Sequence, residues 1–547
     1  MIVPAPRLAA LRDFAADVTV IGSGPVGVVT ALALVGRGFR VLVLESGGEG
    51  PEPASTDLTV AENLRPDNHF EPRTAVARRL GGSSNLWAGR CVPFDPIDFR
   101  ARPWLGLGAW PIGADDLAPY LAPALDALAA GDAVFEAPLG VTADPAFRCD
   151  TLERWSNVPR IQKLHARALA ERGDLLVALR ATVTGFRWRP DGGIAGIELE
   201  AGEEGRGEIP ASRVVLAAGG NASTRLLLLE QERDPALFGG TGGPLGRFYM
   251  GHVSGQIADI VFENATLHDG LDYYVDAHGS YVRRRLVPAE ATQAAERLAN
   301  VAFWPVVPPI ANAVHRSGPL SAVFLALSLA PLGRRLIAEP VRLKHVGPPP
   351  YRRAAHLGNV VRDLPRTLGF APAFLWRNRV ARMRLPGFFL RNRARRYGLE
   401  YHAEQLPDPE SRLTLGEARD RLGQRRLRID LRFGPDDAAS VVRAHAALEA
   451  WLARNRLARL EFYQDDPEAR MAAVLGNARD GAHQVGTIRM AREPGEGVVD
   501  GRCRVFGTPG LYVVSTAVLP TSGQANPTLT AVQLGLRLAD DLAAGRA

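Results

Sequence analysis

Asp17-Val-Thr-Val-Ile-Gly-Ser-Gly-Pro-Val-Gly-Val-Val-Thr-Ala-Leu-Ala-Leu34 predicts a buried strand, a tight glycine turn and a helix. Its glycines, Gly22, Gly24 and Gly27, follow the spacing G-x-G-x-x-G. Gly22 permits the turn, Gly24 lets a pyrophosphate approach the backbone, and Gly27 lets the helix pack closely on the strand. The helix then directs its N-terminal amides toward the phosphates. The stretch therefore predicts an α/β domain that binds a nucleotide, with a plain strand–helix turn as the alternative.

The next apolar strand, residues 41–44, ends in Glu45, which stands eighteen residues after Gly27. An acid at this distance can bind both ribose hydroxyls of an adenosine and would repel a 2′-phosphate. The motif and the acid together predict a dinucleotide, but they do not distinguish FAD from NAD.

The composition limits the class of protein. The chain has 547 residues, enough for two large domains, and a formal net charge of +6, from which nucleic-acid binding does not follow. Its three cysteines form no C-x-x-C pair, so we expect no disulfide framework and no metal site, and a reducing compartment fits best. We expect neither a secretory peptide nor a membrane-spanning helix, because no suitable apolar run is present. The predicted location is cytoplasmic.

A second glycine loop follows at residues 78–90. Its small polar residues and glycines suit a loop that wraps a phosphate or a flavin edge, although a surface turn has the same composition. Strands are then predicted at residues 175–179, 181–188 and 194–199. A buried strand that ends in glycines, residues 214–220, and a helix over residues 221–229 predict a return to the first sheet, which makes the cofactor domain discontinuous.

Residues 251–480 show no doubly wound pattern. We predict helices over residues 115–130 and 436–455 and strands at residues 399–405, 411–415 and 427–433. Between them, residues 334–396 are rich in arginine, and bulky side chains are interleaved with the basic ones: Phe374, Trp376, Phe388 and Phe389. Such a stretch is typical of a monotopic membrane-surface segment and could also serve an anionic substrate or partner. A solvated arginine-rich face with core aromatics is the equally weighted alternative.

Two short pieces near the end carry the candidate chemistry: His483-Gln-Val-Gly-Thr487, and Asn526-Pro-Thr528, which runs into a helix over residues 531–543. Asn526 has the properties of a helix cap, and Pro527 those of a first-turn residue. A histidine of near-neutral pKa can accept a hydroxyl proton, and an asparagine beside it can orient the same oxygen.

These motifs resemble the glucose–methanol–choline (GMC) family of flavin oxidoreductases. The resemblance rests on the first glycine turn with Glu45, Gly81-Gly-Ser-Ser84, Ala217-Ala-Gly219, the His483 motif and the Asn526 motif, in the family's order. It implies an α/β fold in which a discontinuous Rossmann-like FAD-binding domain is joined to an α+β substrate domain with an antiparallel sheet. The corresponding FAD-binding segments are residues 1–100, 170–250 and 486–547, and the substrate domain is residues 251–485 with a basic aromatic insertion near 318–397.

The resemblance also implies bound FAD, with His483 as the base and Asn526 as its partner at flavin N5. The residues that we predict to bind FAD are Gly22, Gly24, Pro25, Val26, Gly27, Glu45, Ser46, Gly82, Ser83, Asn85, Leu86, Val183, Ala218, Thr516, Ala517, Asn526, Pro527 and Thr528. Some relatives attach the flavin through a histidine at the position of Leu86, so noncovalent FAD is predicted here. Many relatives have an acidic residue where Ser515 and Thr516 stand. The contacts that this acid makes on the pyrophosphate side of FAD are therefore expected to differ in this chain.

The expected reaction is oxidation of a CH–OH group of a sugar, polyol or other secondary alcohol by hydride transfer to the flavin. The electron acceptor is left open between O₂ and a quinone-like molecule, and a peripheral membrane contact is left open as well. Two alternatives remain: a lyase on the same scaffold with a redox-silent flavin, and a nonenzymatic membrane-surface protein that acts through residues 334–396.

Overall fold

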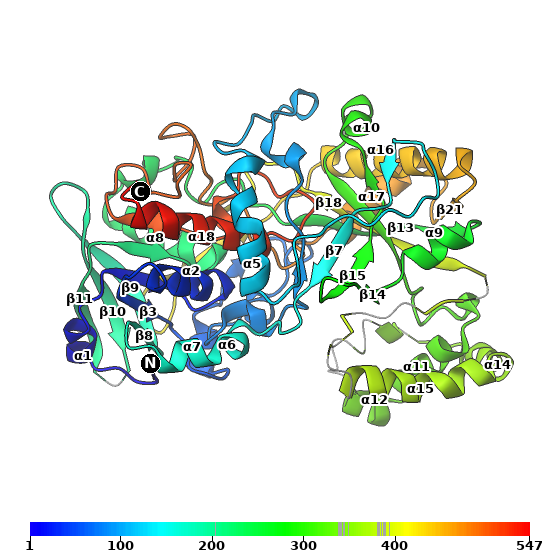
Figure 1. Ribbon diagram of the computed structural model, residues 1–547, viewed down its shortest axis with the longest axis horizontal. Coiled ribbons are helices and arrows are strands. Elements are labelled where there is room, and N and C mark those ends of the chain that lie inside the picture. Colours follow the sequence, from blue (N-terminus) through cyan, green and yellow to red (C-terminus); the bar gives the residue numbers. More distant parts are fainter. Residues whose placement is uncertain are drawn as a thin grey trace.

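A parallel sheet of six strands forms the centre of one half of the molecule (Figure 1). The computed structural model describes residues 1–202, 204–336, 342, 345–347, 349–379, 383, 385–386, 390–392 and 394–546. The strand order is β1-β8-β3-β2-β12-β22. In chain order the strands are β1 Ile2–Val3, β2 Val18–Ile21, β3 Val41–Leu44, β8 Leu175–Ala178, β12 Val214–Leu216 and β22 Leu511–Val513.

The strands of this sheet are apolar on both faces. All four residues of β2, β3 and β8 are buried, as expected of a parallel sheet that is covered on both sides. Helix α2 (Pro25–Val35) follows β2 and packs against the last helix, α18 (Thr528–Ala543). Helix α8 (Gly220–Arg233) follows β12, as the glycine-terminated strand predicts. The sheet therefore joins the beginning of the chain, the region around residue 200 and the C-terminal part.

Five smaller sheets are found in the described residues, and two antiparallel ones are the main sheets outside the parallel one. Strands β9 (Ala181–Trp188), β10 (Ile194–Ala201) and β11 (Gly205–Pro210) form a small sheet beside the first half. The second half contains a four-stranded sheet in the order β17-β18-β13-β21. Its strands are β13 His252–Phe262, β17 Val301–Val306, β18 Arg396–Glu404 and β21 Ala458–Phe462.

This second sheet has its own apolar core. Helices α16 (Pro435–Arg454) and α17 (Pro467–Asn477) pack against it, and Trp451 is fully buried at the contact. The α16 N-terminus is capped by Asp437, whose carboxylate accepts from Gly434 N–H at 2.8 Å. The predicted fold class, a discontinuous Rossmann-like half and an α+β half with an antiparallel sheet, is confirmed.

Four helices of the insertion gather at one corner of the molecule, at the lower right of Figure 1. They are α11 Gly318–Ser328, α12 Ala330–Leu336, α14 Arg353–Arg362 and α15 Leu364–Arg379. A small separate apolar cluster joins Leu320 and Phe324 of α11 to the connecting segments around Ile310 and Val346. Several residues of the predicted basic aromatic stretch lie outside the described residues: Glu339, Lys344, Arg382, Arg384, Phe388, Phe389 and Arg393.

Two local predictions were wrong. The helix predicted over residues 115–130 is limited to α5 (Leu121–Ala127), preceded by two 3₁₀ turns, because Pro119 cannot donate a backbone hydrogen bond inside a longer helix. Asn526 does not cap α18, since the residue at the cap position is Pro527 and no side chain caps that helix end. The Asn526 side chain contacts a histidine instead.

The remaining elements are short. The helices are α1 Leu8–Asp13, α3 Pro53–Asp57, α4 Pro72–Ala75, α6 Ile161–Leu164, α7 Ala166–Glu171, α9 Ala265–Gly270 and α10 Glu290–Ala295. The strands are β4 Glu62–Asn63, β5 Arg90–Cys91, β6 Phe147–Arg148, β7 Leu152–Trp155, β14 Tyr274–Val275, β15 Tyr281–Arg284, β16 Val287–Pro288, β19 Arg412–Arg419 and β20 Arg425–Asp430. Within the described residues, none of the helices combines the length and the apolar character that a membrane span requires.

Candidate active site

A cavity of about 690 Å³ lies at the carboxyl ends of the parallel strands. Its walls include Ile21, Leu44, Ala217 and Ser515, which end or follow β2, β3, β12 and β22. The crevice beyond the carboxyl ends of parallel strands is the usual ligand site of open α/β sheets. The volume is within the range of small-molecule sites, about 300–1,000 Å³.

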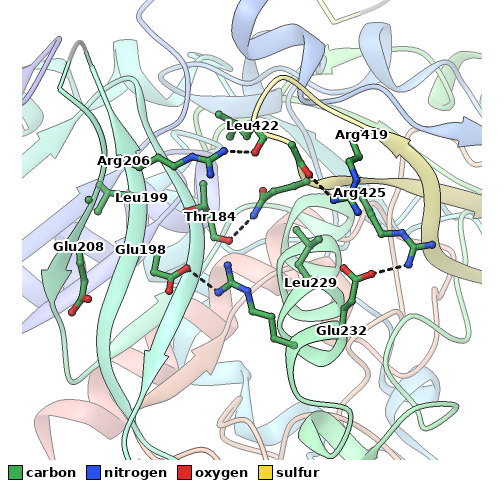
Figure 2. A pocket seen from close by; sticks show the side chains of 14 residues that line it. Thr184, Glu198, Leu199, Arg206, Glu208, Leu229, Glu232, Arg419, Leu422 and Arg425 are labelled. Carbon is green, nitrogen blue, oxygen red and sulfur yellow. Dashed lines mark hydrogen bonds and ion pairs between the residues drawn. The ribbon is translucent and has the colours of Figure 1, made fainter.

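Another cavity, shown in Figure 2, has a different character. It lies between the β9–β11 sheet, α8 and the β19–β20 hairpin, and charged side chains line it. Most of these charges are paired: Arg233 with Glu198 at 2.8 Å, and Arg425 with Glu232 at 2.7 Å. None of the residues predicted as site residues is part of its described lining, so we place no chemistry there.

Most of the predicted site residues line the 690 Å³ cavity. These are Gly22, Gly24, Pro25, Val26, Glu45, Ser46, Gly82, Ser83, Leu86, Val183, Ala218, His483, Thr516, Asn526, Pro527 and Thr528. Three others do not line it: Gly27, Asn85 and Ala517. Gly27 and Ala517 pack behind the wall, and the Asn85 amide donates to Leu80 O and Gly82 O, which holds the second glycine loop in shape.

The first glycine turn is shaped for a backbone-bound ligand. Gly22 has φ +103°, and a Cβ there would lie 2.6 Å from Ala217 O. A Cβ on Gly27 would lie 2.1 Å from Gly22 O, so strand and helix can be this close only without side chains. A Cβ on Gly24 would meet nothing within 4 Å, because Gly24 faces the open cavity at the start of α2. The turn therefore leaves room for a phosphate group at the helix N-terminus.

Glu45 is buried at the end of β3, where its carboxylate is held by the first glycine turn. Ser23 N–H and Oγ–H donate to Oε2 at 3.1 and 2.6 Å, and Gly47 N–H donates to Oε1 at 3.0 Å. These contacts fix the carboxylate at the cavity wall. Fixed there, it can accept hydrogen bonds from vicinal hydroxyls of a ligand.

His483 and Asn526 meet in the same cavity. Asn526 Nδ2 lies 3.0 Å from His483 Nε2, and in this amide orientation the Nδ2–H donates to an unprotonated Nε2. Asn526 Oδ1 is buried and has no partner among the described residues. Oδ1 of the amide is thus an open acceptor, and Nε2 of the histidine becomes one when the Asn526 N–H turns to the oxygen of an alcohol, whose O–H needs an acceptor of this kind.

A second histidine sets the tautomer of the first. His483 Nδ1 lies 2.8 Å from Nδ1 of His252, the first residue of β13, so one of these two nitrogens carries the shared hydrogen. If Nε2 of His483 accepts from Asn526, its Nδ1 is the donor to His252. The ring of His402, on β18, stacks on that of His252 with centroids 4.2 Å apart.

Burial keeps this cluster neutral. Burial first, and then the positive charge of Arg90, lower the pKa of His483 to about 4. The pKa values of His252 and His402 are also lowered well below the usual value, mainly by burial. Ligand nitrogens of the three histidines lie within 4.8 Å of one another, a grouping that could also hold a metal ion. We expect neutral imidazoles at pH 7, of which His483 can act as a base.

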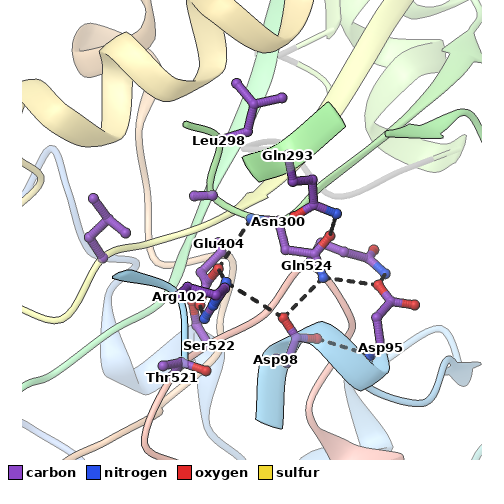
Figure 3. Close-up of polar contacts among 12 residues, drawn as sticks. Asp95, Asp98, Arg102, Gln293, Leu298, Asn300, Glu404, Thr521, Ser522 and Gln524 are labelled. Atoms are coloured by element: carbon purple, nitrogen blue, oxygen red, sulfur yellow. Dashed lines mark hydrogen bonds and ion pairs between the residues drawn. The ribbon is translucent and has the colours of Figure 1, made fainter. Parts of the chain in front are cut away.

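A buried polar network surrounds Gln524, two residues before Asn526 (Figure 3). Gln524 is the centre of this network. Its main-chain carbonyl oxygen lies 2.6 Å from His402 Nδ1. Its side-chain Nε2 donates to Asp95 at 2.9 Å, and its side-chain Oε1 accepts from Arg285 at 2.9 Å. Asn300 Nδ2 also donates to Asp95, at 2.9 Å. The contacts join both halves of the molecule next to the histidines, two residues before Asn526 in the chain.

The same network contains a carboxyl group of altered acidity. Asp98 is buried close to Glu404, and Figure 3 shows these two acids next to Arg102. Arg102 Nη2 donates to Glu404 Oε1 at 2.7 Å, and Arg102 Nη1 lies 3.9 Å from Asp98 Oδ1. Burial, followed by the neighbouring carboxylates of Glu404 and Asp95, raises the pKa of Asp98 well above its usual value. A buried carboxyl group beside a second buried acid favours its protonated form.

Aromatic and cationic side chains form the opposite wall of the cavity. Arg90 donates to Glu153 at 2.5 Å, and its guanidinium lies 4.6 Å from the ring centroid of Trp304. Arg283 binds the same carboxylate and lies 4.7 Å from the same ring. This wall combines apolar surface with positive charge beside His483.

The sequence did not reveal His252, His402, Arg90, Arg283 or Trp304 as site residues. Arg90 belongs to the predicted second glycine loop and could have been considered there. The others are on β13, β15, β17 and β18 and belong to no recognisable motif. Only the pairing of distant strands brings them to the cavity.

Two family models match the chain. The model for GMC oxidoreductase matches residues 407–535, and the model for FAD dependent oxidoreductase matches residues 17–286. Together they include the glycine turn, Glu45, His483 and Asn526.

Curated relatives match over part of their length. The 2-methyl-1,2-propanediol dehydrogenase of Mycolicibacterium austroafricanum is 26% identical over 314 residues, which are 45% of this chain and 56% of that protein. The C-glycoside 3-oxidase of Microbacterium trichothecenolyticum is 40% identical over 67 residues, 11% of this chain and 13% of that protein. The chain thus matches about half of the first relative and a small part of the second.

Solved structures share the fold along nearly the whole chain. The structure of pyridoxine 4-oxidase from Mesorbium loti has a TM-score of 0.55 at 16% identity and covers 96% of this chain and 98% of its own. The structure of formate oxidase has a TM-score of 0.52 at 17% identity and covers 97% of this chain and 98% of its own. These structures show the fold, and the two family models, which carry the first glycine turn, Glu45, His483 and Asn526, place the chain in the GMC oxidoreductase family of FAD-dependent oxidoreductases.

Proposed function

We propose that the protein oxidises a CH–OH group of a small alcohol, sugar or polyol, with noncovalently bound FAD as the hydride acceptor. This proposal rests on the contact of His483 Nε2 with the Asn526 amide, in the same cavity that the first glycine turn lines. The names of the relatives, a diol dehydrogenase and a C-glycoside oxidase, support the substrate class.

The residues present fit FAD. Gly24 leaves an open cradle for the pyrophosphate, Glu45 is fixed where an adenosine ribose would lie, and Asn526 Oδ1 is a buried acceptor without a described partner. When bound, FAD supplies a hydride acceptor, its N5 atom. As the proposed division, residues 1–100, 170–250 and 486–547 hold the cofactor, and residues 251–485 form the substrate domain.

Side chains of the protein accept the proton of the alcohol and orient its oxygen. His483 Nε2 accepts the hydroxyl proton, which leaves the carbon able to release a hydride. The Asn526 side chain hydrogen-bonds the same oxygen and fixes the C–H direction. His252 Nδ1 accepts from His483 Nδ1–H, which keeps Nε2 unprotonated. When the substrate binds, the Asn526 N–H turns from Nε2 to the alcohol oxygen, and Nε2 is then available as the base. The aromatic wall with Trp304 excludes water from the reacting carbon.

An anaerobic substrate screen tests this function. Candidate alcohols, sugars and polyols are mixed with the holoprotein without O₂, and the flavin absorbance is followed. Bleaching of the flavin by one class is the expected result. Turnover with an unchanged flavin spectrum would instead indicate a lyase with a redox-silent flavin. Reoxidation of the bleached flavin by O₂ or by a soluble quinone then identifies the acceptor class.

Noncovalent FAD is expected to leave the polypeptide on acid denaturation. Leu86, which is half-exposed at the cavity, offers no nucleophilic atom for a link, and no cysteine is part of the described cavity lining. After precipitation in acid, all flavin absorbance should remain in the supernatant. Flavin that sediments with the polypeptide would contradict a noncovalent site.

The pH dependence of flavin reduction should report the His483 pKa. The base must be unprotonated, and burial with Arg90 holds its pKa at about 4, so the rate constant should be constant down to about pH 5 and fall below that. Arg90→Gln removes one of the two causes of the lowered pKa. The decline should then begin at a higher pH, because protonation of His483 becomes easier.

Arg283→Gln is the matched control for this pH experiment. Arg283 binds the same Glu153 and the same Trp304, but it is not among the causes of the lowered His483 pKa. The variant should therefore keep the wild-type pH profile, measured by anaerobic stopped-flow with the best substrate of the screen. Identical profiles for all three proteins would argue against an electrostatic role of Arg90.

We further propose a peripheral membrane contact through the arginine-rich stretch 334–396, supported by its composition.

A further inference from the structure

Large apolar side chains are exposed on the helical insertion more than elsewhere. Among the described residues, thirteen large hydrophobic side chains are exposed, and seven of them lie between residues 314 and 368. The seven are Val314, Leu329, Leu332, Leu357, Val361, Leu364 and Leu368. Scattered single residues of this kind are normal on a protein surface, but a concentration in one tenth of a chain indicates an interaction surface.

Four of these side chains form two pairs at helical spacing. Leu357 and Val361 are four residues apart on α14, and Leu364 and Leu368 are four residues apart on α15, so each pair shares one helix face. The most exposed are Val361 at 72% and Leu368 at 67%. We call these four residues the α14–α15 face.

The opposite side of α14 is already used for packing. His356 is buried with Nδ1 3.1 Å from Ser321 Oγ on α11, and Asn359 Nδ2 donates to Ala313 O at 2.8 Å. Phe324 of α11 stacks on the His356 ring with centroids 4.0 Å apart. The helix is therefore docked on α11 by its polar side, and its apolar side remains outward.

The charge around this face has one sign. Residues 334–396 contain sixteen Lys and Arg against two acids, a formal charge of +14 in a chain whose total is +6. Arg352, Arg353, Arg362 and Arg366 are exposed on or beside α14 and α15. The one described acid among these helices, Asp363, accepts from Gly318 N–H at 3.2 Å. Exposed apolar residues surrounded by arginines complement a surface with an apolar interior and negative headgroups.

We propose that the α14–α15 face docks on the headgroup layer of an anionic phospholipid bilayer, with the four apolar side chains inserted among the lipids and the arginines on the phosphates. This assigns residues and a lipid class to the peripheral membrane contact and does not depend on the chemistry proposed for the flavin site. The insertion also borders that site, because Val306 before it and Pro386 after α15 both line the cavity.

Vesicle flotation of the holoprotein tests the proposal. The probes are vesicles of phosphatidylcholine alone and of phosphatidylcholine with an equal amount of phosphatidylglycerol, at 0.1 M and about 0.5 M salt, where charges are more strongly screened. We expect binding to the anionic vesicles only, weaker at high salt. The variant L357Q/V361Q/L364Q/L368Q should bind at least tenfold more weakly. A wild-type protein that does not float with anionic vesicles would overturn the proposal.

A matched variant separates this face from general surface effects. L64Q/V158Q/V275Q changes exposed apolar residues elsewhere and should bind vesicles like the wild type. Flavin absorbance verifies that every variant is folded around its cofactor. If the quadruple variant floats like the wild type, or if it instead converts a wild-type dimer to a monomer in light scattering, the face is not a membrane surface and the proposal fails.

Discussion

Replacing His483 with alanine is expected to lower the rate constant of flavin reduction by about 10²–10⁴-fold, the usual contribution of a positioned general base. The ring is half-buried at the cavity and, with its lowered pKa, neutral at pH 7; Nε2 is directed at the Asn526 amide and Nδ1 at His252. Alanine removes the acceptor of the hydroxyl proton but none of the cradle that would hold FAD. The loss should therefore appear in the rate of reduction and not in the amount of bound flavin.

Anaerobic stopped-flow measures this rate, and the ratio of flavin to protein absorbance measures the bound FAD. His445→Ala is the control, because His445 is a fully buried histidine outside the cavity lining, in the core of the second half, with Nδ1 2.8 Å from Val441 O of its own helix. The control should retain a near wild-type rate even if its stability falls. Full turnover of His483→Ala would refute the base assignment.

Local patterns explain why much of the fold was predictable. The strand, turn and helix of residues 17–34 are adjacent in sequence, and steric limits at Gly22 and Gly27 force the turn that the sequence predicts. The same holds for β12 with α8, where a buried strand ends in glycines. These signals depend on neighbours within a few residues, so a single sequence is sufficient.

Long-range strand pairing explains why part of the site was missed. In the pairing of β13 with β18, His252 is opposite Glu404 and Ser254 is opposite His402. The two histidines are therefore diagonal neighbours on one face of the sheet, close enough for their rings to stack. About 150 residues separate them in the chain, and no local pattern fixes this register.

Asn526 shows how a tertiary contact can replace a local preference. Asparagine before Pro-Thr is a favourable helix cap, and a cap is what the local pattern predicts. In the structure the amide turns to His483, and α18 begins without a side-chain cap. A cap contributes about 1 kcal/mol, so one buried contact in a cofactor site can outweigh it.

Replacing Glu45 with glutamine is expected to weaken FAD binding by about 10–100-fold, since a hydrogen bond to a charged group contributes about 1.5–3 kcal/mol. The buried carboxylate already accepts from Ser23 and Gly47, and it lines the cavity where the ribose is expected. Glutamine keeps the shape but loses the charge and one acceptor atom. Arginine at this position should abolish FAD retention, because it places a cation against the amides of the glycine turn.

Titration of the apoprotein with FAD, followed by flavin fluorescence quenching, gives the dissociation constants. Glu52→Gln is the control, because the same substitution seven residues later affects a carboxylate that pairs with Arg180 at 2.6 Å outside the cavity lining. Thermal unfolding of the apoproteins separates the two effects of Glu45→Gln. If its Tm without FAD stays near that of Glu52→Gln while FAD affinity falls, the lost interaction is with the ligand and not with Ser23. A Glu45→Gln protein that binds FAD as tightly as the wild type would rule out the adenosine role, because no other acid among the described residues lines this cavity.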